Sequence, residues 1–168
     1  KVPSMLVQRS ALVARPAAQL FDLIEGAEHY PAFLPWCESA QIVTRNDELV
    51  SADLRVRFHG LSFEMRTRNP KRRPEFMEIH LERGPFRRFF GQWKLAQLGT
   101  IGCRIDFSLD WEFDSALMSH AASPLFAKAA STLVDAFVDR ALAMPEHHEP
   151  AAPTAAQPAS DLPPPPAA

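Results

Sequence analysis

The sequence has few of the residues on which disulfide-bonded, metal-binding and membrane-spanning folds depend. Its 168 residues contain two cysteines, Cys37 and Cys103, which form no Cys-x-x-Cys pair, and no Cys/His cluster has the spacing of a zinc site. This predicts two buried free thiols and no metal. No apolar run is long enough to span a bilayer, and the N-terminal residues have no apolar centre like that of a signal peptide. Both observations predict a cytosolic protein.

Proline is unevenly distributed. Eight of the 16 prolines fall in residues 145–168, where alanine is also frequent and Lys and Arg do not occur. A segment of this composition buries too little apolar surface to offset its chain entropy. We therefore predict one globular domain over residues 1–144 and a disordered Pro/Ala-rich tail over residues 145–168.

Hydrophobic spacing predicts the elements of the domain. After a strand over about residues 4–13, apolar residues recur with helical spacing between Pro16, at the first helical position, and Gly26, which is placed to end the helix. Two prolines limit the segment "HYPAFLPWC", residues 29–37, to a short second helix. From about residue 39 to 113 the period becomes two, which predicts about six antiparallel strands with one wet face.

Two further signals set the details. His59-Gly60 has the composition of a two-residue hairpin turn, which would pair Phe58 with Leu61, Val56 with Phe63, Leu54 with Met65, Arg55 with Glu64 and Asp53 with Arg66. A last helix of about twenty residues is expected to begin with Ser123 as N-cap and Pro124 at its first position. The order of elements predicts an α+β fold in which a curved antiparallel sheet wraps around this long C-terminal helix.

Four motifs carry a resemblance to a known family: "YPAFLPWC", "GPFRRFFGQW", "CRIDFSLDWEF" and "LVDAFVDRA". Over about residues 4–143 the chain resembles the bacterial ribosome association toxin/coenzyme Q-binding family, whose START-like, Bet v 1-like helix-grip domains are often labelled polyketide cyclase. The resemblance implies a sheet of about six to seven strands with two short helices after the first strand. It also implies one of two functions: binding of ubiquinone or its isoprenoid intermediates in support of respiration, or binding of the large ribosomal subunit, which blocks subunit association.

Catalytic residues are not evident. The predicted inward faces of the strands contain no Asp, Glu, His or Lys that could act as a general acid or base. Cys37 follows an aromatic bend, with His29 eight residues earlier, but this order matches no cysteine-enzyme pattern, so a structural thiol is favoured over a reactive one. Asp106, Asp110 and Glu112 alternate along one strand and are interpreted as a solvated face in preference to a metal site.

Positive charge is concentrated in one part of the chain. Residues 55–94 hold eleven Lys or Arg against four Glu, a net charge of +7, whereas residues 104–139 have a net charge of −4. Such a region is either an ordinary solvated face or a surface that contacts phosphate groups of RNA or lipid. The candidate residues of this basic surface are Arg68, Arg72, Arg73, Arg87 and Arg88.

The chain has many aromatic residues on its predicted inward faces. In a flat sandwich they would be core, but a strongly curved sheet closed by one helix can leave an apolar cavity beside the helix, and the family resemblance favours a ligand tunnel. We predict that this cavity is lined by Phe21, Phe33, Leu34, Trp36, Phe58, Phe63, Trp93, Phe107, Phe126, Leu133 and Phe137.

Three functions remain open at this point. The first is a non-catalytic protein, cytoplasmic or peripheral to the inner membrane, that needs no cofactor and binds ubiquinone or a similar isoprenoid lipid. The second is a ribosome association toxin that uses the basic surface. The third is an enzyme of the aromatase/cyclase kind. The sequence identifies neither the ligand nor the oligomeric state.

Overall fold

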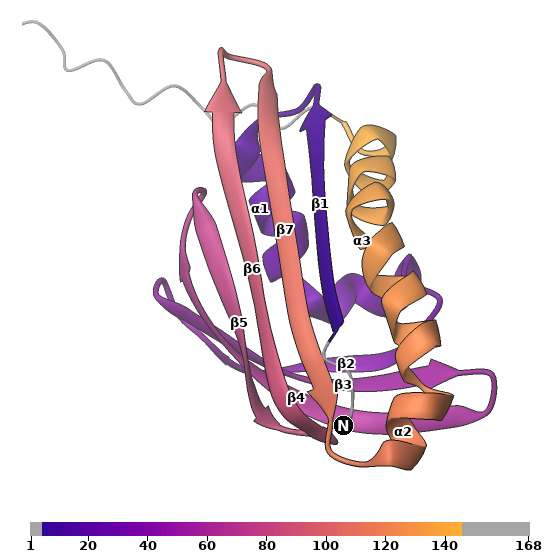
Figure 1. Ribbon diagram of the computed structural model, residues 1–168. Helices are drawn as coiled ribbons and strands as arrows, with labels where there is room; N and C mark the ends of the chain where they lie inside the picture. Colours follow the sequence, from indigo (N-terminus) through magenta and orange to yellow (C-terminus); the bar gives the residue numbers. More distant parts are fainter. Residues whose placement is uncertain (1–4, 146–168) are drawn as a thin grey trace, which may run out of the picture.

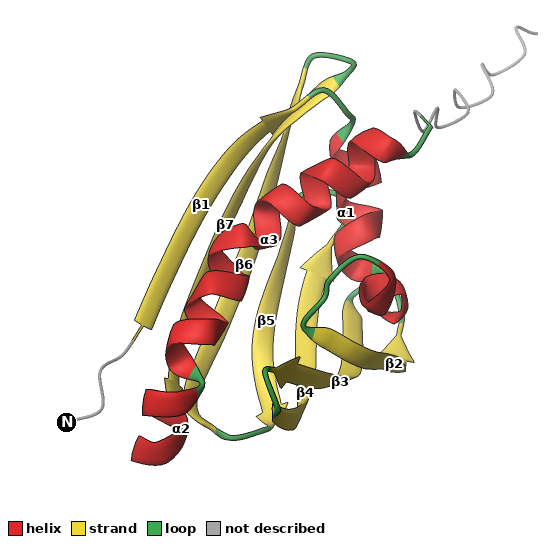
Figure 2. Ribbon diagram, turned by 90° about the vertical axis from the view of Figure 1, so that its right-hand side faces the viewer, coloured by secondary structure: helices red, strands yellow, loops and turns green. Residues whose placement is uncertain are grey.

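Residues 5–145 are described by a computed structural model (Figure 1). One seven-stranded antiparallel sheet, in the order β1-β7-β6-β5-β4-β3-β2, curves around the long helix α3 (Figure 2). The elements are β1 (Met5–Val13), α1 (Ala17–Glu25), the 3-10 helix η1 (Ala27–Ala32), β2 (Cys37–Arg45), β3 (Leu49–Phe58), β4 (Leu61–Arg72), β5 (Phe76–Arg83), β6 (Phe86–Leu98), β7 (Gly102–Phe113), α2 (Ala116–Ala121) and α3 (Ser123–Ala143). This is the predicted curved sheet with its long C-terminal helix.

The core lies between the concave face of the sheet and the helices α1 and α3 (Figure 2). Alternation along β7 buries Ile105, Phe107, Leu109 and Trp111 on one face, as the period of two requires. The helices complete the core with apolar faces of their own, from α1 with Leu20, Phe21 and Ile24 and from α3 with Phe126, Ala130, Val134, Phe137 and Ala141. No helix within residues 5–145 is long and apolar enough to cross a membrane.

The β3–β4 hairpin has the predicted register. All five expected pairs are present, from Phe58 opposite Leu61 to Asp53 opposite Arg66. The turn is made by His59 and Gly60, with φ angles of 44° and 89°. Positive φ at both central residues is the geometry that matches the twist of the flanking strands.

Three predicted boundaries are wrong. Pro16 is the extended N-cap of α1, which begins at Ala17, and the second short helix covers residues 27–32 instead of 29–37. Ser123 does not cap α3, whose N-cap is Ala122, the residue that follows a helix we did not predict, α2. Ser115 caps α2 and accepts the N–H of Met118 at 3.2 Å.

Ser123 has a different role in the structure. It is the first residue of α3, and its hydroxyl accepts the indole N–H of the buried Trp111 at 3.3 Å. A buried indole needs such an acceptor. Ser123 therefore connects α3 to β7.

Candidate functional site

An apolar cavity of about 90 Å³ lies between the helices and the concave face of the sheet. Strands β3 to β7 provide one wall, and α1, η1, the η1–β2 connection and α3 provide the rest. The cavity is lined by Ile24, Glu25, Ala27, Tyr30, Trp36, Val50, Ala52, Leu54, Val56, Met65, Thr67, Asn69, Ile79, Phe89, Trp93, Phe107, Leu109, Phe126, Ala129, Ala130, Leu133 and Phe137.

Aromatic rings form much of the cavity wall. Trp93 packs on Phe107 with 4.4 Å between ring centroids, and its ring meets the edge of Phe137 at 5.3 Å. Phe137 in turn contacts Tyr30 at 5.5 Å, again in an edge-on arrangement. Rings in edge-on contact are a preferred arrangement of aromatic side chains. On the α3 side the wall includes two small residues, Ala129 and Ala130, which do not fill the space between the helix and the sheet.

The predicted lining residues divide into two groups. Those that line the cavity are Trp36, Trp93, Phe107, Phe126, Leu133 and Phe137. The other five, Phe21, Phe33, Leu34, Phe58 and Phe63, pack in the core around it. Whether either group contacts a ligand remains a prediction.

The five residues outside the cavity wall have identifiable partners or burial. Phe21 and Leu34 are each 1% exposed within the core. Phe33 packs against Phe137 on one side and under the guanidinium of Arg140 on the other. Phe58 and Phe63 belong to an aromatic cluster around Phe126 that also includes Phe86 and Phe113.

Four polar residues of the lining were missed by the sequence prediction: Glu25, Tyr30, Thr67 and Asn69. For two of them a signal existed. The alternation that places Met65 on the inward face of β4 continues to Thr67 and Asn69, which have the same parity. Glu25 has no comparable signal, because its position depends on where the end of α1 meets the sheet.

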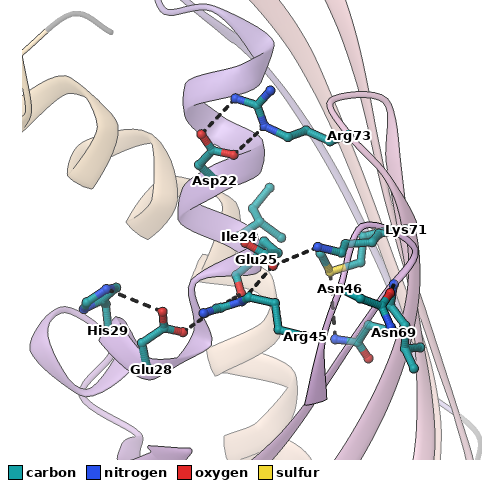
Figure 3. A network of polar contacts seen from close by, with 12 residues as sticks. Asp22, Ile24, Glu25, Glu28, His29, Arg45, Asn46, Asn69, Lys71 and Arg73 are labelled. Atoms are coloured by element: carbon teal, nitrogen blue, oxygen red, sulfur yellow. Dashed lines mark hydrogen bonds and ion pairs between the residues drawn. The ribbon is translucent and has the colours of Figure 1, made fainter. Parts of the chain in front are cut away.

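Glu25, which lines the cavity, belongs to a charged network (Figure 3). Its Oε1 lies 2.9 Å from Lys71 Nζ and 2.9 Å from Arg45 Nε, and Arg45 also reaches Glu28 Oε2 at 2.7 Å. The Lys71 side chain is only 8% exposed, and a buried ammonium of this kind requires an anionic partner. The hydrogen bond from Arg45 also holds the pKa of Glu28 below its usual value.

Asn69 stands two residues before Lys71 on β4 and lines the same cavity (Figure 3). Its side-chain Nδ2 donates to Met77 Sδ at 3.8 Å. Its Oδ1 is buried and has no hydrogen-bond partner within the described residues. Buried acceptors without a donor are rare in folded proteins.

Tyr30 is a poor candidate for acid–base chemistry. Its hydroxyl donates to the carbonyl oxygen of Ile24, and burial raises the pKa of this phenol above its ordinary value. The hydroxyl is therefore protonated and engaged with the backbone.

Neither thiol is a nucleophile at neutral pH. Cys37 and Cys103 are free and buried, as predicted, and burial raises the pKa of each thiol to about 11. The reactive species is the thiolate, which is scarce at such a pKa. Residues 5–145 also contain no group of His, Cys, Asp and Glu side chains placed to hold a metal ion.

The predicted basic surface consists mostly of ion pairs. Arg88 lies 2.8 Å from Asp110 and 3.1 Å from Glu112, and Arg87 lies 3.4 Å from Glu112. The basic strand β6 and the acidic strand β7 are neighbours in the sheet, so the charge difference seen along the sequence is largely cancelled on the surface. The solvated face interpreted from the sequence is present only in part. The side chains of Asp106 and Asp110 are 40% and 42% exposed, whereas that of Glu112 is only 13% exposed, and all three are paired with arginines.

The other three arginines of this surface differ in whether they form ion pairs. Arg72 lies 2.8 Å from Glu75, and Arg73 makes two contacts, of 2.8 and 3.0 Å, with Asp22 of α1 (Figure 3). Arg68 is exposed on β4. Phe90, which shares the outer face of β6 with Arg88, packs against the ring of His80 at 5.2 Å and is half-buried.

The curved sheet, the enclosed helix and the apolar cavity between them define a helix-grip domain of the START/Bet v 1-like class. Residues 13–138 match the family described as polyketide cyclase / dehydrase and lipid transport, and the chain belongs to this family.

Relatives with recognisable sequences include ribosome association toxins and a coenzyme Q-binding protein. The ribosome association toxin RatA of Pseudomonas aeruginosa is 40% identical over 135 residues, which are 80% of this chain and 94% of that protein. RatA of Escherichia coli is 34% identical over 80% of this chain and 85% of its own length. A mitochondrial coenzyme Q-binding protein of Xenopus laevis, COQ10 homolog B, is 25% identical over 73% of this chain and 52% of that protein.

Solved structures share the fold at low sequence identity. A Streptomyces aromatase/cyclase, Zhui, superimposes with a TM-score of 0.72 at 15% identity, covering 83% of this chain and 94% of that one. A START superfamily protein of Mycobacterium smegmatis has a TM-score of 0.62 at 20% identity, with 82% and 93% covered.

Proposed function

We propose that the chain is a non-catalytic binding protein that holds ubiquinone or a related isoprenoid lipid in its cavity. The observation that carries this proposal is the largely aromatic and aliphatic wall of the cavity between α3 and the sheet. Walls of this kind, with a few polar groups at one end, are typical of sites for apolar ligands. The lipid-transport description of the family and the name of the Xenopus relative support it.

Ligand entry requires the cavity to widen. Its volume of about 90 Å³ is below the roughly 300 Å³ at which pockets for drug-sized ligands begin. Several wall residues are only half-buried, among them Trp36 and Leu133. Movement of these side chains would enlarge the cavity. Because Trp36 lies in the η1–β2 connection, this segment is the part of the wall that would open to admit a ligand.

Lipid extraction tests the proposal. The protein, purified from its own host without detergent, would be extracted with organic solvent and the extract examined by mass spectrometry for isoprenoid quinones. We expect a quinone or a biosynthetic relative in more than trace amount. Protein that is consistently empty, and that binds no added short-chain ubiquinone, would contradict the proposal.

A second candidate function is association with the large ribosomal subunit. It is favoured by relatives named ribosome association toxin, two of which are 40% and 34% identical over most of their lengths. Four arginines of the basic surface form ion pairs, which reduces the positive charge available to contact phosphate groups of ribosomal RNA: Arg72, Arg73, Arg87 and Arg88. The exposed Arg68 is therefore the first residue to test.

Co-sedimentation with isolated large subunits at graded salt tests this candidate, because phosphate contacts give binding that weakens steeply as salt rises. Reversal of charge with Arg68→Glu and Arg72→Glu should weaken binding. Arg104→Glu, which changes an exposed arginine of β7 outside the basic surface, is the matched control. Equal binding by all variants would exclude this surface.

An aromatase/cyclase activity has less support. The similarity to the Streptomyces enzyme is at 15% identity and concerns the fold alone. Glu25, the acidic residue of the cavity wall, forms ion pairs with two cations, and the Tyr30 hydroxyl donates to a backbone carbonyl.

The proposed lipid carrier would act in the cytoplasm, with peripheral contact to the inner membrane where quinones reside.

A further inference from the structure

Exposed apolar side chains gather at one end of the domain. Scattered singly they would be ordinary for a protein surface. Five of the eight large apolar side chains that are exposed within residues 5–145 lie, however, at the end of β1, in and beside the β6–β7 turn, and at the end of α3: Leu12, Leu98, Ile101, Leu142 and Met144. These three segments occupy the same end of the molecule in both views (Figure 1 and Figure 2). We call this end, with its five side chains, the apolar tip.

Hydrogen bonds from the start of α1 fix the segments of the tip relative to one another. The Ala17 N–H donates to Gln97 Oε1 near the end of β6, at 2.8 Å. Gln19 Nε2 donates to the carbonyl oxygens of Ala141 and Pro145 at the end of α3, each at 3.4 Å. The third segment is held by the pairing of β1 with β7 along its whole length. The tip is therefore a surface of defined shape.

Two of the exposed side chains serve neither the core nor the turn. Ile101 is 69% exposed in the β6–β7 turn, next to Thr100 and to Gly99, which has a φ of 61°. Turns are usually built from Gly, Pro, Asn, Asp and Ser, so an isoleucine contributes nothing to forming this one. Leu12 is 74% exposed and lies opposite the exposed Arg104 in the register of β1 and β7. Side chains of this kind mark a surface that meets an apolar partner.

Positive charge accompanies the apolar tip. Its segments, residues 12–16, 96–104 and 140–145, contain three Arg and no Asp or Glu. Arg104 forms an ion pair with Asp106, farther along β7. The other two, Arg15 and Arg140, have no carboxylate partner within the described residues, because the contacts of Arg15 are with backbone carbonyl oxygens and Arg140 lies over the ring of Phe33. Both are partly exposed.

We infer that the apolar tip docks the domain on a lipid bilayer with anionic head groups. The aliphatic side chains would enter the boundary between head groups and acyl chains, and the arginines beside them would contact phosphate groups. A second copy docked tip to tip would instead bring the arginines of both copies together, which is unfavourable. The inference goes beyond the proposed function, and it does not depend on what the cavity binds, because none of the five side chains of the tip lines the cavity.

Co-sedimentation of the purified full chain with vesicles tests the inference. Vesicles of phosphatidylglycerol and phosphatidylethanolamine would be compared with vesicles of phosphatidylcholine alone. Each arginine near an anionic surface strengthens binding by about fivefold, whereas Asp139 and the three carboxylates that residues 146–168 carry without any Lys or Arg weaken it. We therefore expect binding to the anionic vesicles to be about threefold tighter, a preference that rising salt should remove.

A pair of double variants locates the surface. Leu98→Gln/Ile101→Gln removes two aliphatic side chains of the tip and should lower the affinity for anionic vesicles by at least about tenfold, with no loss of affinity for decylubiquinone. Leu6→Gln/Leu117→Gln is the matched control. It changes two leucines, 62% and 78% exposed, at the opposite end of the molecule, where α2 and the start of β1 lie (Figure 1), and it should bind vesicles like the unmodified protein.

Several outcomes would overturn the inference. These are an absence of binding to anionic vesicles, an equal loss of binding in both double variants, and equal binding of the unmodified protein to both kinds of vesicle. A dimer in sedimentation velocity without lipid, dissociated by Leu98→Gln/Ile101→Gln, would assign the tip to a second copy. If that variant is destabilised, the comparison of vesicles on the unmodified protein decides alone. Decylubiquinone binding tests the proposed function separately, so the two can fail independently.

Discussion

Trp36 is, with Tyr30, one of the two residues of the proline-bent segment "HYPAFLPWC" that line the cavity. It is half-buried and lines the wall, whereas its neighbour Phe33 packs outside it against Phe137 and Arg140. Trp36→Ala should therefore lower the affinity for decylubiquinone by about tenfold, the loss of roughly one large aromatic contact, and lower the free energy of unfolding less than a fully buried tryptophan would.

Phe33→Ala is the matched control for this substitution. It removes an aromatic ring from the same segment and should lower the melting temperature, with little change in affinity. Fluorescence or calorimetric titration gives the affinities, and thermal unfolding gives the stabilities. Equal loss of affinity in both variants would mean that the segment acts through its fold and not through Trp36.

The two thiols predict a dependence of stability on alkaline pH. Burial raises the pKa of Cys37 and Cys103 to about 11 in the folded protein, whereas an unfolded thiol titrates near about 8.5. Above about pH 8.5 the unfolded chain has released protons that the folded protein still holds, so the free energy of unfolding falls as pH rises, by at most about 1.4 kcal/mol per pH unit for each thiol.

Urea unfolding between about pH 8 and pH 9.5 measures this slope, in a window below the ordinary pKa of tyrosine near about 10. The double variant Cys37→Ala/Cys103→Ala should be somewhat less stable at neutral pH and should show a smaller decline. A decline of equal steepness in the variant would assign it to other groups. Single Cys37→Ser should keep ligand binding unchanged, since the thiol does not line the cavity.

At the scale of the element, the β3–β4 hairpin is fixed by its turn. Gly60 has a φ of 89° and open space around the position of a side chain, so Gly60→Ala tests backbone strain without a steric clash. We expect it to lower the free energy of unfolding by about 1–2 kcal/mol, the cost of a left-handed conformation for a residue with a Cβ. His59→Asn, which favours the same conformation, should raise it slightly. Chemical denaturation measures both, and an unchanged stability for Gly60→Ala would contradict the role of the turn.

The elements differ in how far local sequence determines them. The register of β3 and β4 could be predicted because apolar pairs, charge pairs and the turn agree on one alignment. The cap of α3 could not. Ser123 and Pro124 have the composition of a helix start, but the N-cap of α3 is Ala122, and the capping serine Ser115 belongs to the preceding helix α2. The Ser123 hydroxyl instead accepts the indole N–H of Trp111, a tertiary contact with no local signal in the sequence.

At the scale of the whole molecule, the curved sheet around a helix could be predicted from periodicity and element order, but the exact wall of the cavity could not. Phe58 and Phe63 have the same inward parity as the lining residues, yet they join an aromatic cluster beside the cavity. Glu25 reaches the wall only because the end of α1 meets Lys71 of β4. The pairing of basic side chains was likewise not predictable from local sequence: Arg87 and Arg88 of β6 form ion pairs with carboxylates of the neighbouring strand β7.

The most direct measurement of the central claim is ligand affinity after the cavity has been filled. Ala130 is buried on α3 and lines the cavity, whereas Ala143 is exposed in the last turn of the same helix. Affinity for decylubiquinone would be measured for the unmodified protein, Ala130→Leu and Ala143→Leu, together with their melting temperatures. We predict equal affinity for the unmodified protein and Ala143→Leu, and a loss of at least about tenfold for Ala130→Leu in a protein that remains folded, because the added carbons occupy the space of the ligand. Undiminished binding by a folded Ala130→Leu, or no binding by the unmodified protein, would contradict the account.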